Sequence, residues 1–207
     1  MAVAPLYHRI IKRREAHDFA VKLLEDVGLS IEQLQRFPHE FSGGQVQRIC
    51  IARALSLSPK LLVCDESVST LDVSIQAQIL NLFKELQESF GMSYLFISHD
   101  LGVIRYISDR IAVMYLGKIV EIAEKEQLFR SLKHPYTKAL LLSIPASHPE
   151  HRKKHNVLKG DVRSPTHVYP GCSFIDRCLD ASERCQRKIP ELRKIESRHQ
   201  VCCHLYK

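Results

Sequence analysis

Two carboxylates and a histidine follow apolar segments that we expect to be neighbouring strands. Asp65 and Glu66 end the apolar run 61–64, and His99 comes shortly after the run 93–97. In α/β sheets, ligands bind beyond the carboxyl ends of parallel strands. At such an edge, one carboxylate can hold Mg²⁺ while its neighbour orients and deprotonates a water that attacks a phosphate. His99 can donate a hydrogen bond to that phosphate. A structural role for His99 at a strand end is the alternative.

A serine and two glycines introduce a second segment suited to phosphate chemistry. Ser42, Gly43, Gly44 and Gln45 stand directly before an apolar-periodic stretch. Two glycines allow a backbone to approach a ligand closely, and the start of the following helix offers free N–H groups and a positive dipole end. Ser42 can cap that helix or bind a phosphate oxygen. Taken alone, such a segment is more often a plain capped helix after a loop.

The seven cysteines form two groups. Cys50 and Cys64 lie in apolar surroundings and are predicted to be core residues. No apolar signal segment follows the basic N-terminal residues, so we expect a reducing compartment, where clustered thiols favour metal or cluster ligation over disulfides. Four thiolates on loops can hold zinc or an iron–sulfur cluster, although two-residue zinc-finger gaps are missing, and free thiols are the alternative. The clustered thiols are Cys172, Cys178, Cys185, Cys202 and Cys203.

Helices and strands alternate in the segments that must position these residues. Apolar residues at helical spacing predict helices over 17–27, 45–55, 74–90 and 101–107. The runs 61–64 and 93–97 are short and continuously apolar, which is typical of strands buried on both faces of a parallel sheet. Further along, the pattern predicts a hairpin over 111–122 and helices over 125–132 and 136–143. The alternation indicates the α/β class.

Composition narrows the class of protein. The apolar fraction of 45% and charged fraction of 26% are ordinary for a globular chain. No run approaches eighteen apolar residues, so a membrane span is not expected. Most of the net charge of +7 lies in the C-terminal region. A solvated basic surface is favoured over nucleic-acid or anionic-lipid binding, and the lack of an aromatic platform interleaved with those basic residues weakens the nucleic-acid alternative.

The phosphate-binding candidates together resemble the second half of an ABC-transporter ATPase. Residues 40–45 are similar to the family's signature, 61–66 to its Walker B strand, 69–72 to its D-loop, and His99 to its switch histidine. The resemblance implies that Asp65 is the Mg²⁺-side carboxylate, Glu66 the general base and His99 the γ-phosphate sensor. It further implies that residues 42–45 bind nucleotide and that Asp72 lies in the contact between two ATPase subunits. Phe41, Val46 and Ser67 depart from the family pattern.

A narrower resemblance is to the ATP-binding subunits of oligopeptide/dipeptide importers. It rests on residues 37–45, 71–78 and 134–137 and extends from Pro5 to the C-terminus. It implies an ABC ATPase part over 1–133 and an importer-type extension over 134–207. Similar Gly-Cys-x-Phe-x-x-Arg-Cys tails, here residues 171–178, occur in these ATPases, and some bind a [4Fe–4S] cluster. The resemblance then implies Cys172, Cys178, Cys185 and Cys203 as ligands, with Cys202 as a neighbouring substitute.

The family resemblance also implies an assembly and a missing part. The 207 residues contain no phosphate-cradling G-x-x-x-x-G-K-[ST] loop, so we expect an incomplete P-loop (RecA-like) core with a helical signature segment and a small Cys-rich appendage. We expect a truncated copy, inactive alone, using ATP and Mg²⁺. The implied partners are a second ATPase subunit, two transmembrane permease subunits and, indirectly, an extracytoplasmic peptide-binding protein, with no nucleic acid. The implied place is the cytoplasmic face of the membrane.

Three alternatives to a peptide-import ATPase stay open at this point. The chain could be a non-catalytic module that completes a partner's ATPase site in trans. It could serve an importer for nickel or another solute, because those ATPases are closely similar. It could be a nucleic-acid-associated ABC ATPase, although residues 134–136 argue against that class.

Overall fold

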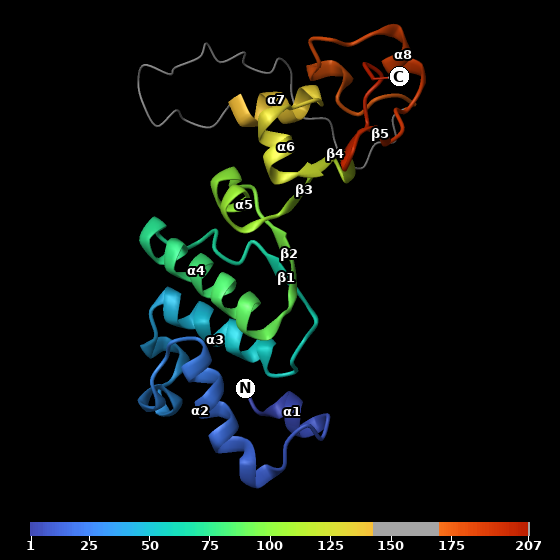
Figure 1. Cartoon of the computed structure of the whole chain (residues 1–207). Coiled ribbons are helices and arrows are strands. Elements are labelled where there is room, and N and C mark those ends of the chain that lie inside the picture. The colour runs from blue at the N-terminus through green and yellow to red at the C-terminus, as the bar shows by residue number, and fades with distance from the viewer. Residues whose placement is uncertain (143–169, 207) are drawn as a thin grey trace. The chain divides into compact units, whose positions relative to one another are not determined.

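The computed structural model describes residues 1–142 and 170–206 (Figure 1). These residues form two compact units, Met1–Ile107 and Ser108–Lys207. The predicted division between residues 133 and 134 follows the family resemblance and stays a prediction.

The first unit is a layer of helices packed on a small parallel sheet (Figure 1). Phe83, fully buried at the centre, meets the rings of Tyr94 and Phe96 edge to face. The buried core also includes Leu23, Leu24 and Val27. The spacing of these residues predicted a helix over 17–27, and the structure has a helix over most of this range. The helices are α1 Val3–Tyr7, α2 Ala16–Asp26, α3 Gly43–Leu55, α4 Val73–Phe90 and α5 Leu101–Ile107.

Helix ends agree with the local sequence signals. Asp72 caps α4 by accepting a hydrogen bond from the backbone N–H of Ile75 at 2.9 Å. Gly91 ends the same helix with φ of +63°, in the left-handed region that glycine enters at little cost. The predicted helices over 17–27, 45–55, 74–90 and 101–107 are confirmed to within two residues at each end.

The sheet of the first unit has one buried and one uncovered face. Strands β1 Leu61–Asp65 and β2 Ser93–Ile97 are parallel, with Val63 opposite Leu95 and Asp65 opposite Ile97. Burial on both faces was therefore the wrong expectation. Side chains that alternate along the two strands remain about half exposed, namely Leu61 (56%), Val63 (55%), Leu95 (53%) and Ile97 (45%). Helix α4 covers only the face that carries Phe96 and Cys64.

The expectation for the two core cysteines is half right. Cys64 is buried, and burial raises the pKa of its thiol to about 11. Cys50 is exposed, because α3 turns Ile51, Ala52 and Leu55 toward the core and leaves position 50 on the outer side.

The second unit is built on a four-stranded antiparallel sheet in the order β3-β4-β6-β5. The predicted hairpin is confirmed, since β3 pairs with β4 around Gly117 at φ of +74°. A second hairpin from the C-terminal region joins this sheet through β6, which sequence periodicity did not predict. The strands are β3 Arg110–Tyr115, β4 Lys118–Glu124, β5 Arg193–Glu196 and β6 His199–Val201.

Three short helices accompany this sheet: α6 Lys125–Arg130, α7 Pro135–Leu142 and α8 Glu183–Arg187. The helices predicted over 125–132 and 136–143 correspond to α6 and α7, although residue 143 lies outside the described residues. Within the part of the chain that the structure describes, no helix has both the length and the apolar character needed to cross a bilayer.

The two faces of the β1–β2 sheet predict different responses to mutation. Leu95→Thr on the uncovered face should change the free energy of unfolding by less than about 1 kcal/mol and reduce self-association, because it removes exposed apolar surface while keeping a strand-forming residue. Phe83→Ala should cost about 3–5 kcal/mol. Urea unfolding and sedimentation velocity of the 207-residue polypeptide measure both effects. Equal destabilisation by the two variants would contradict the one-sided burial.

Candidate functional site

Glu66 and His99 lie together beyond the ends of the two parallel strands. The backbone N–H of Glu66 donates to the carbonyl of Ile97 at 3.0 Å, which extends the β1–β2 pairing by one residue. Oε1 of Glu66 lies 2.9 Å from Nδ1 of His99. Hydrogen bonding to His99 lowers the pKa of the Glu66 carboxyl, and the same bond raises the pKa of the His99 imidazole. The structure therefore pairs an ionised carboxylate with an imidazole at the carboxyl ends of the two parallel strands.

The backbone at Glu66 is in a conformation that L-residues rarely adopt. Its φ is +48°, which costs about 1–2 kcal/mol for a residue with a Cβ. Such conformations cluster at functional sites. The turn that follows is fixed by Ser69, whose hydroxyl donates to the carbonyl oxygen of Glu66 at 2.9 Å. The left-handed turn directs the Glu66 side chain to His99.

Asp65 is the last residue of β1 and is exposed on the uncovered face, in register with Ile97. Across the described ranges 1–142 and 170–206, no group of three or more His, Cys, Asp or Glu side chains is arranged to hold one metal ion. This finding is compatible with magnesium at Asp65, because protein Mg²⁺ sites commonly use one or two carboxylates and complete the shell with water and substrate phosphates.

The glycine pair opens α3, and the residues on either side of it are engaged in a capping box. Ser42 caps the helix, its Oγ accepting from the backbone N–H of Gln45 at 3.4 Å. The Gln45 side chain accepts from the backbone N–H of Ser42 at 3.0 Å. Gly43 and Gly44 are the first helical residues, whose N–H groups have no partner within the helix. Gln45 thus has a structural function that the sequence interpretation did not assign.

The two glycines differ in the room around them. A Cβ on Gly44 would stand 2.6 Å from Cγ2 of Ile75, so the packing of α3 on α4 requires glycine there. A Cβ on Gly43 would meet Leu71 Cδ2 at 3.6 Å, an ordinary contact. Packing within this unit therefore explains the glycine at 44 and leaves the glycine at 43 unexplained. Close approach by a group from outside the described chain would explain it.

The predicted site residues gather in two places within the first unit. Asp65, Glu66 and His99 meet at the strand ends. The segment 42–45 lies against Leu71 and Ile75, which follow the Glu66 turn. Asp72, predicted to contact a second subunit, caps α4. Ser67, at a position where the sequence departs from the family pattern, has a buried hydroxyl with no hydrogen-bond partner in the described residues.

Four cysteines of the second unit line one cavity of about 40 Å³, together with His134 and Phe174. None of the cysteines is in a disulfide. Gly171 allows this arrangement, because a Cβ there would stand 2.2 Å from the carbonyl oxygen of Cys185. The four are the predicted ligands Cys172, Cys178, Cys185 and Cys203.

Cys202 and Cys203 are adjacent in the sequence but have different surroundings in the structure. Cys202 does not line the cavity, and its thiol donates to the carbonyl of Pro190 at 3.1 Å. Burial raises the pKa of Cys203 to about 11 and raises those of Cys178 and Cys202. Neighbouring cysteines raise the pKa values of Cys178 and Cys203 further. Deprotonation of Cys178 and Cys203 therefore calls for a compensating positive charge, such as a metal supplies.

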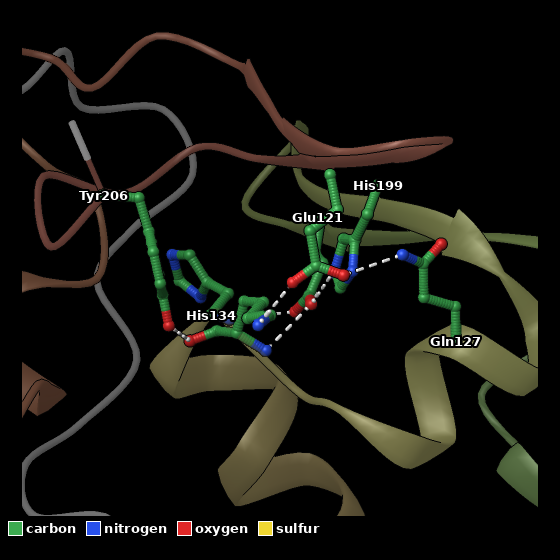
Figure 2. Close-up of polar contacts among 7 residues, drawn as sticks. Glu121, Gln127, His134, His199 and Tyr206 are labelled. Carbon is green, nitrogen blue, oxygen red and sulfur yellow. Dashed lines mark hydrogen bonds and ion pairs between the residues drawn. The ribbon is translucent and has the colours of Figure 1, made fainter.

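A buried carboxylate organises the same unit, and sequence reasoning missed it (Figure 2). Glu121 of β4 is fully buried and accepts three hydrogen bonds, from the backbone N–H groups of Lys133 and His134 at 2.9 Å each and from Nε2 of His199 at 2.8 Å. These bonds fix the start of α7 and strand β6 to the hairpin. The available signal was a glutamate between Val120 and Ile122 in a strand, where a charge needs partners.

An outer layer of polar contacts surrounds this carboxylate. The Tyr206 hydroxyl donates to the carbonyl oxygen of Lys133 at 3.0 Å, and the Lys133 ammonium pairs with Glu196 at 2.8 Å. Gln127 donates to the same Glu196 at 2.9 Å. Figure 2 shows dashed contacts that involve Gln127 of α6, His134 just before α7, His199 of β6 and Tyr206 near the C-terminal end. The fold of the Cys-rich region thus depends on a shared polar network as well as on apolar contacts.

His134 connects that network to the cysteine cavity. Its backbone N–H is bound to Glu121, its Nδ1 accepts from the backbone N–H of Tyr136 at 3.0 Å, and its ring lies 5.7 Å from that of Phe174. Burial lowers the pKa of His134 to about 4, despite the opposing effect of Glu121. The ring is therefore neutral at physiological pH, with its proton on Nε2.

Comparison with known proteins bears on both units. The family model described as ABC transporter matches residues 6–69, and the one described as oligopeptide/dipeptide transporter, C-terminal region, matches residues 120–185. An ATP-binding cassette of an ABC transporter, MJ1267 in its ADP conformation, superposes with a TM-score of 0.56 at 28% identity, covering 65% of this chain and 52% of that one. The predicted α/β ABC ATPase fold is confirmed at this level.

Curated relatives agree over nearly the whole chain. The oligopeptide transport ATP-binding protein AppF of Bacillus subtilis is 51% identical over 201 residues. The di/tripeptide transport ATP-binding protein DppF of Pseudomonas aeruginosa is 47% identical over 199 residues. Each alignment covers 96% of this chain and 61% of the relative, so the chain spans about three fifths of the relatives' length.

These matches show that the chain is similar to ABC transporter ATP-binding proteins over 96% of its length. The resemblance to the oligopeptide/dipeptide transporter group, which the motifs predicted, is confirmed by the match to that group's C-terminal region and by the named relatives.

The buried imidazole of His134 predicts a pH-dependent stability. The folded-state pKa of about 4 lies below the unfolded value of 6.5, so the unfolded chain binds more protons between these values. Stability should therefore fall as pH falls through that window, by about 3 kcal/mol in total. His134→Asn keeps an acceptor for Tyr136 and should remove this loss. Urea unfolding at pH 7 and pH 4.5 measures it.

The matched control for this measurement is Leu179→Asn at an exposed position (68%), which should keep the full loss between pH 7 and pH 4.5. If His134→Asn loses as much stability on acidification as the unmodified chain, the buried neutral histidine is not the cause.

Proposed function

We propose that this chain is part of the ATPase subunit of an importer for oligopeptides or dipeptides, and that ATP hydrolysis at its sites drives peptide uptake. One observation supports this above the others. The Glu66–His99 pair, joined at 2.9 Å, stands at the ends of two parallel strands in a chain whose relatives are named for peptide transport and ATP binding. The relatives' names favour peptides over nickel or other solutes.

The proposal gives each polar side chain of the site a role. Glu66 accepts the proton of the attacking water, and the depressed pKa keeps its carboxylate ionised for that purpose. His99 holds Glu66 before nucleotide arrives and then donates to the terminal phosphate. Asp65, beside Glu66, would hold Mg²⁺, which neutralises phosphate charge when bound. Ser42 and the N–H groups of Gly43 and Gly44 would stabilise phosphate oxygens at a helix N-terminus.

The phosphate cradle for this chemistry must come from residues other than these 207. A helix crossing back over a parallel sheet runs antiparallel to its strands, so its N-terminus lies at their carboxyl ends. The uncovered apolar face of Leu61, Val63, Leu95 and Ile97 ends at Asp65, where such a helix would present its first N–H groups. A polypeptide of these 207 residues alone would bind ATP weakly and hydrolyse essentially none.

The glycine pair would serve a nucleotide held by a second ATPase subunit. Gly43 has room for a side chain in its own unit. Val46, which follows the pair in α3, and Val73, at the start of α4, are exposed apolar side chains (40% and 81%). Such a surface suits a partner protein. The assembly would include two permease subunits and, indirectly, an extracytoplasmic peptide-binding protein, with the ATPase at the cytoplasmic membrane face. A non-catalytic module acting only in trans would keep this surface without using Glu66.

Two substitutions at position 43 test the proposed function in a complex with an intact ATP-binding partner. Gly43→Ala should leave the thermal melting temperature unchanged, because its Cβ meets only an ordinary contact. Gly43→Asp should lower partner-dependent ATPase activity by about 10²–10³, since it puts a charged side chain where a phosphate must approach. Unchanged activity in Gly43→Asp would exclude nucleotide binding by the pair.

The catalytic role of Glu66 has a separate readout in the same experiment. In a complex whose subunit also carries the phosphate cradle, Glu66→Gln should abolish turnover at the site that contains Glu66 while leaving ATP binding in place. If Glu66→Gln leaves turnover intact while Gly43→Asp abolishes it, the trans-acting module is favoured.

A second candidate activity is cofactor binding by the cysteine cavity. We propose a [4Fe–4S] cluster held by Cys172, Cys178, Cys185 and Cys203. One observation supports it: these four thiols line one cavity from which Cys202 is excluded. When bound, a cluster would cross-link loops that bury little apolar surface.

Metal analysis of anaerobically purified protein tests the cluster. Iron and acid-labile sulfide should be present in comparable amounts, with visible absorbance. Cys178→Ser should remove the absorbance, whereas Cys50→Ser and Cys202→Ser should keep it, because Cys50 and Cys202 do not line the cavity. Zinc without sulfide would indicate a structural metal, and neither metal would leave free thiols.

A further inference from the structure

The two ring nitrogens of His134 have different surroundings. The side chain is buried (2% exposed), and its Nδ1 accepts a hydrogen bond from the backbone N–H of Tyr136 at 3.0 Å. In a neutral imidazole whose Nδ1 accepts, the proton lies on Nε2. Among residues 1–142 and 170–206, no hydrogen-bond partner of Nε2 is found. A buried donor without a partner is unfavourable, so this N–H group has a hydrogen bond to offer to a bound group.

The ring of His134 lies at the cysteine cavity. His134 lines the same space of about 40 Å³ as the four cysteines. Phe174 lines it too, and its ring centroid is 5.7 Å from that of His134. Thiolate and sulfide sulfur atoms are negatively charged acceptors of hydrogen bonds. A group that brings such atoms into this cavity therefore needs donors in the cavity wall.

Other polar side chains of the cavity wall are less suited to that task. His204 is bound through Nε2 to a backbone carbonyl oxygen at 2.8 Å, which leaves its Nδ1 as an acceptor in the neutral ring. An ionised carboxylate, as on Asp180, has no proton to donate. The Ser182 hydroxyl lies 3.4 Å from Sγ of Cys185 and is already beside one of the four thiols. Nε2 of His134 is thus the available ring N–H among the residues that line the cavity.

Several contacts fix the position of this N–H group. The His134 backbone N–H donates to the buried carboxylate of Glu121 at 2.9 Å, and the His134 carbonyl accepts from the backbone N–H of Lys138 at 3.1 Å. The bond from Tyr136 to Nδ1 sets the orientation of the ring, which also packs against Phe174. A donor that is held in this way loses little conformational entropy when it engages a bound group.

We propose that His134 is a positioning residue of the cysteine site. Its Nε2–H donates a hydrogen bond to a sulfur atom of the iron–sulfur cluster that the four thiolates would hold, and this bond raises the reduction potential of the cluster. On reduction the cluster gains one electron from a low-potential reductant, and the added negative charge strengthens the hydrogen bond. His134 keeps its proton in both oxidation states. The inference rests on the proposed cluster and names the side chain that sets its potential.

Two amide substitutions separate the functions of the two ring nitrogens. Asparagine places its polar group near the position of Nδ1, and glutamine places its amide nitrogen near that of Nε2. His134→Asn should therefore keep the bond from Tyr136 and lose the donor to the cavity, whereas His134→Gln should keep the donor. The measurement is a redox titration of anaerobically purified protein with dithionite, followed by electron paramagnetic resonance.

His134→Asn should lower the equilibrium constant for one-electron reduction about tenfold, which is a shift of about 59 mV to lower potential. His134→Gln should keep the potential of the unmodified protein. The matched control is Tyr115→Phe, which removes a hydroxyl from the same aromatic cluster. The Tyr115 ring lies 5.2 Å from that of Phe174 but does not line the cavity, so this control should leave the potential unchanged.

Isotope labelling keeps the proposal testable if His134→Asn folds poorly. With ¹⁵N-labelled histidine, the reduced protein should show a hyperfine coupling between a histidine nitrogen and the cluster, and His134→Gln should lose that coupling. Absence of the coupling, equal potential shifts in His134→Asn and His134→Gln, or an unchanged potential in a folded His134→Asn would each overturn the inference. In these cases iron and sulfide in the protein still support the cluster. If the unmodified protein holds neither, both proposals fail.

Discussion

The parallel pairing of β1 with β2 is the constraint on which the candidate site depends. It continues one residue beyond β1, where the Glu66 N–H donates to the carbonyl of Ile97. That bond places Glu66 in the left-handed region and brings its carboxylate to His99. The packing of the surrounding core, in which Cys64, Val68 and Phe83 are buried, offsets the conformational free energy of the strained Glu66 backbone.

Each of the two units contains one close contact at a glycine, and each contact requires that glycine. Gly44 lets α3 contact Ile75, and Gly171 lets the loop of Cys172 contact the carbonyl of Cys185. Neither glycine has an unusual φ, so conformational freedom is not the reason for them. Close packing is the reason, and it is why neighbouring glycines such as 43 and 44 have different physical meanings. A glycine that packing does not require, as at 43, is the more informative one about function.

The second unit is stabilised in a different way from the first. Its C-terminal segment has few long helices or strands, and its apolar contacts gather around Phe174, Tyr115 and Tyr136. A buried carboxylate supplies the remaining order, since an unpaired charge at Glu121 would be strongly unfavourable and its three donors come from separate segments. Removing any donor leaves the charge less compensated. The polar network therefore selects one arrangement of α7 and β6, and with it the cavity that the four cysteines line.

Local patterns in the sequence determined much of this protein. The helical spacing of Leu23, Leu24 and Val27, the glycine at 91 that ends α4, and the hairpin around Gly117 all act over a few residues, so they could be read without tertiary information. The order of Ser42–Gln45, Asp65–Glu66 and His99 likewise indicated phosphate chemistry and the family. Only the tertiary structure decided that one sheet face is uncovered and that Gly44 packs on Ile75. It also decided that Cys50 is exposed and that Cys202 lies outside the cavity. The bond between Glu121 and His199 was likewise visible only in the tertiary structure. Each of these depends on contacts between residues far apart in the chain, which periodicity and motif spacing do not encode.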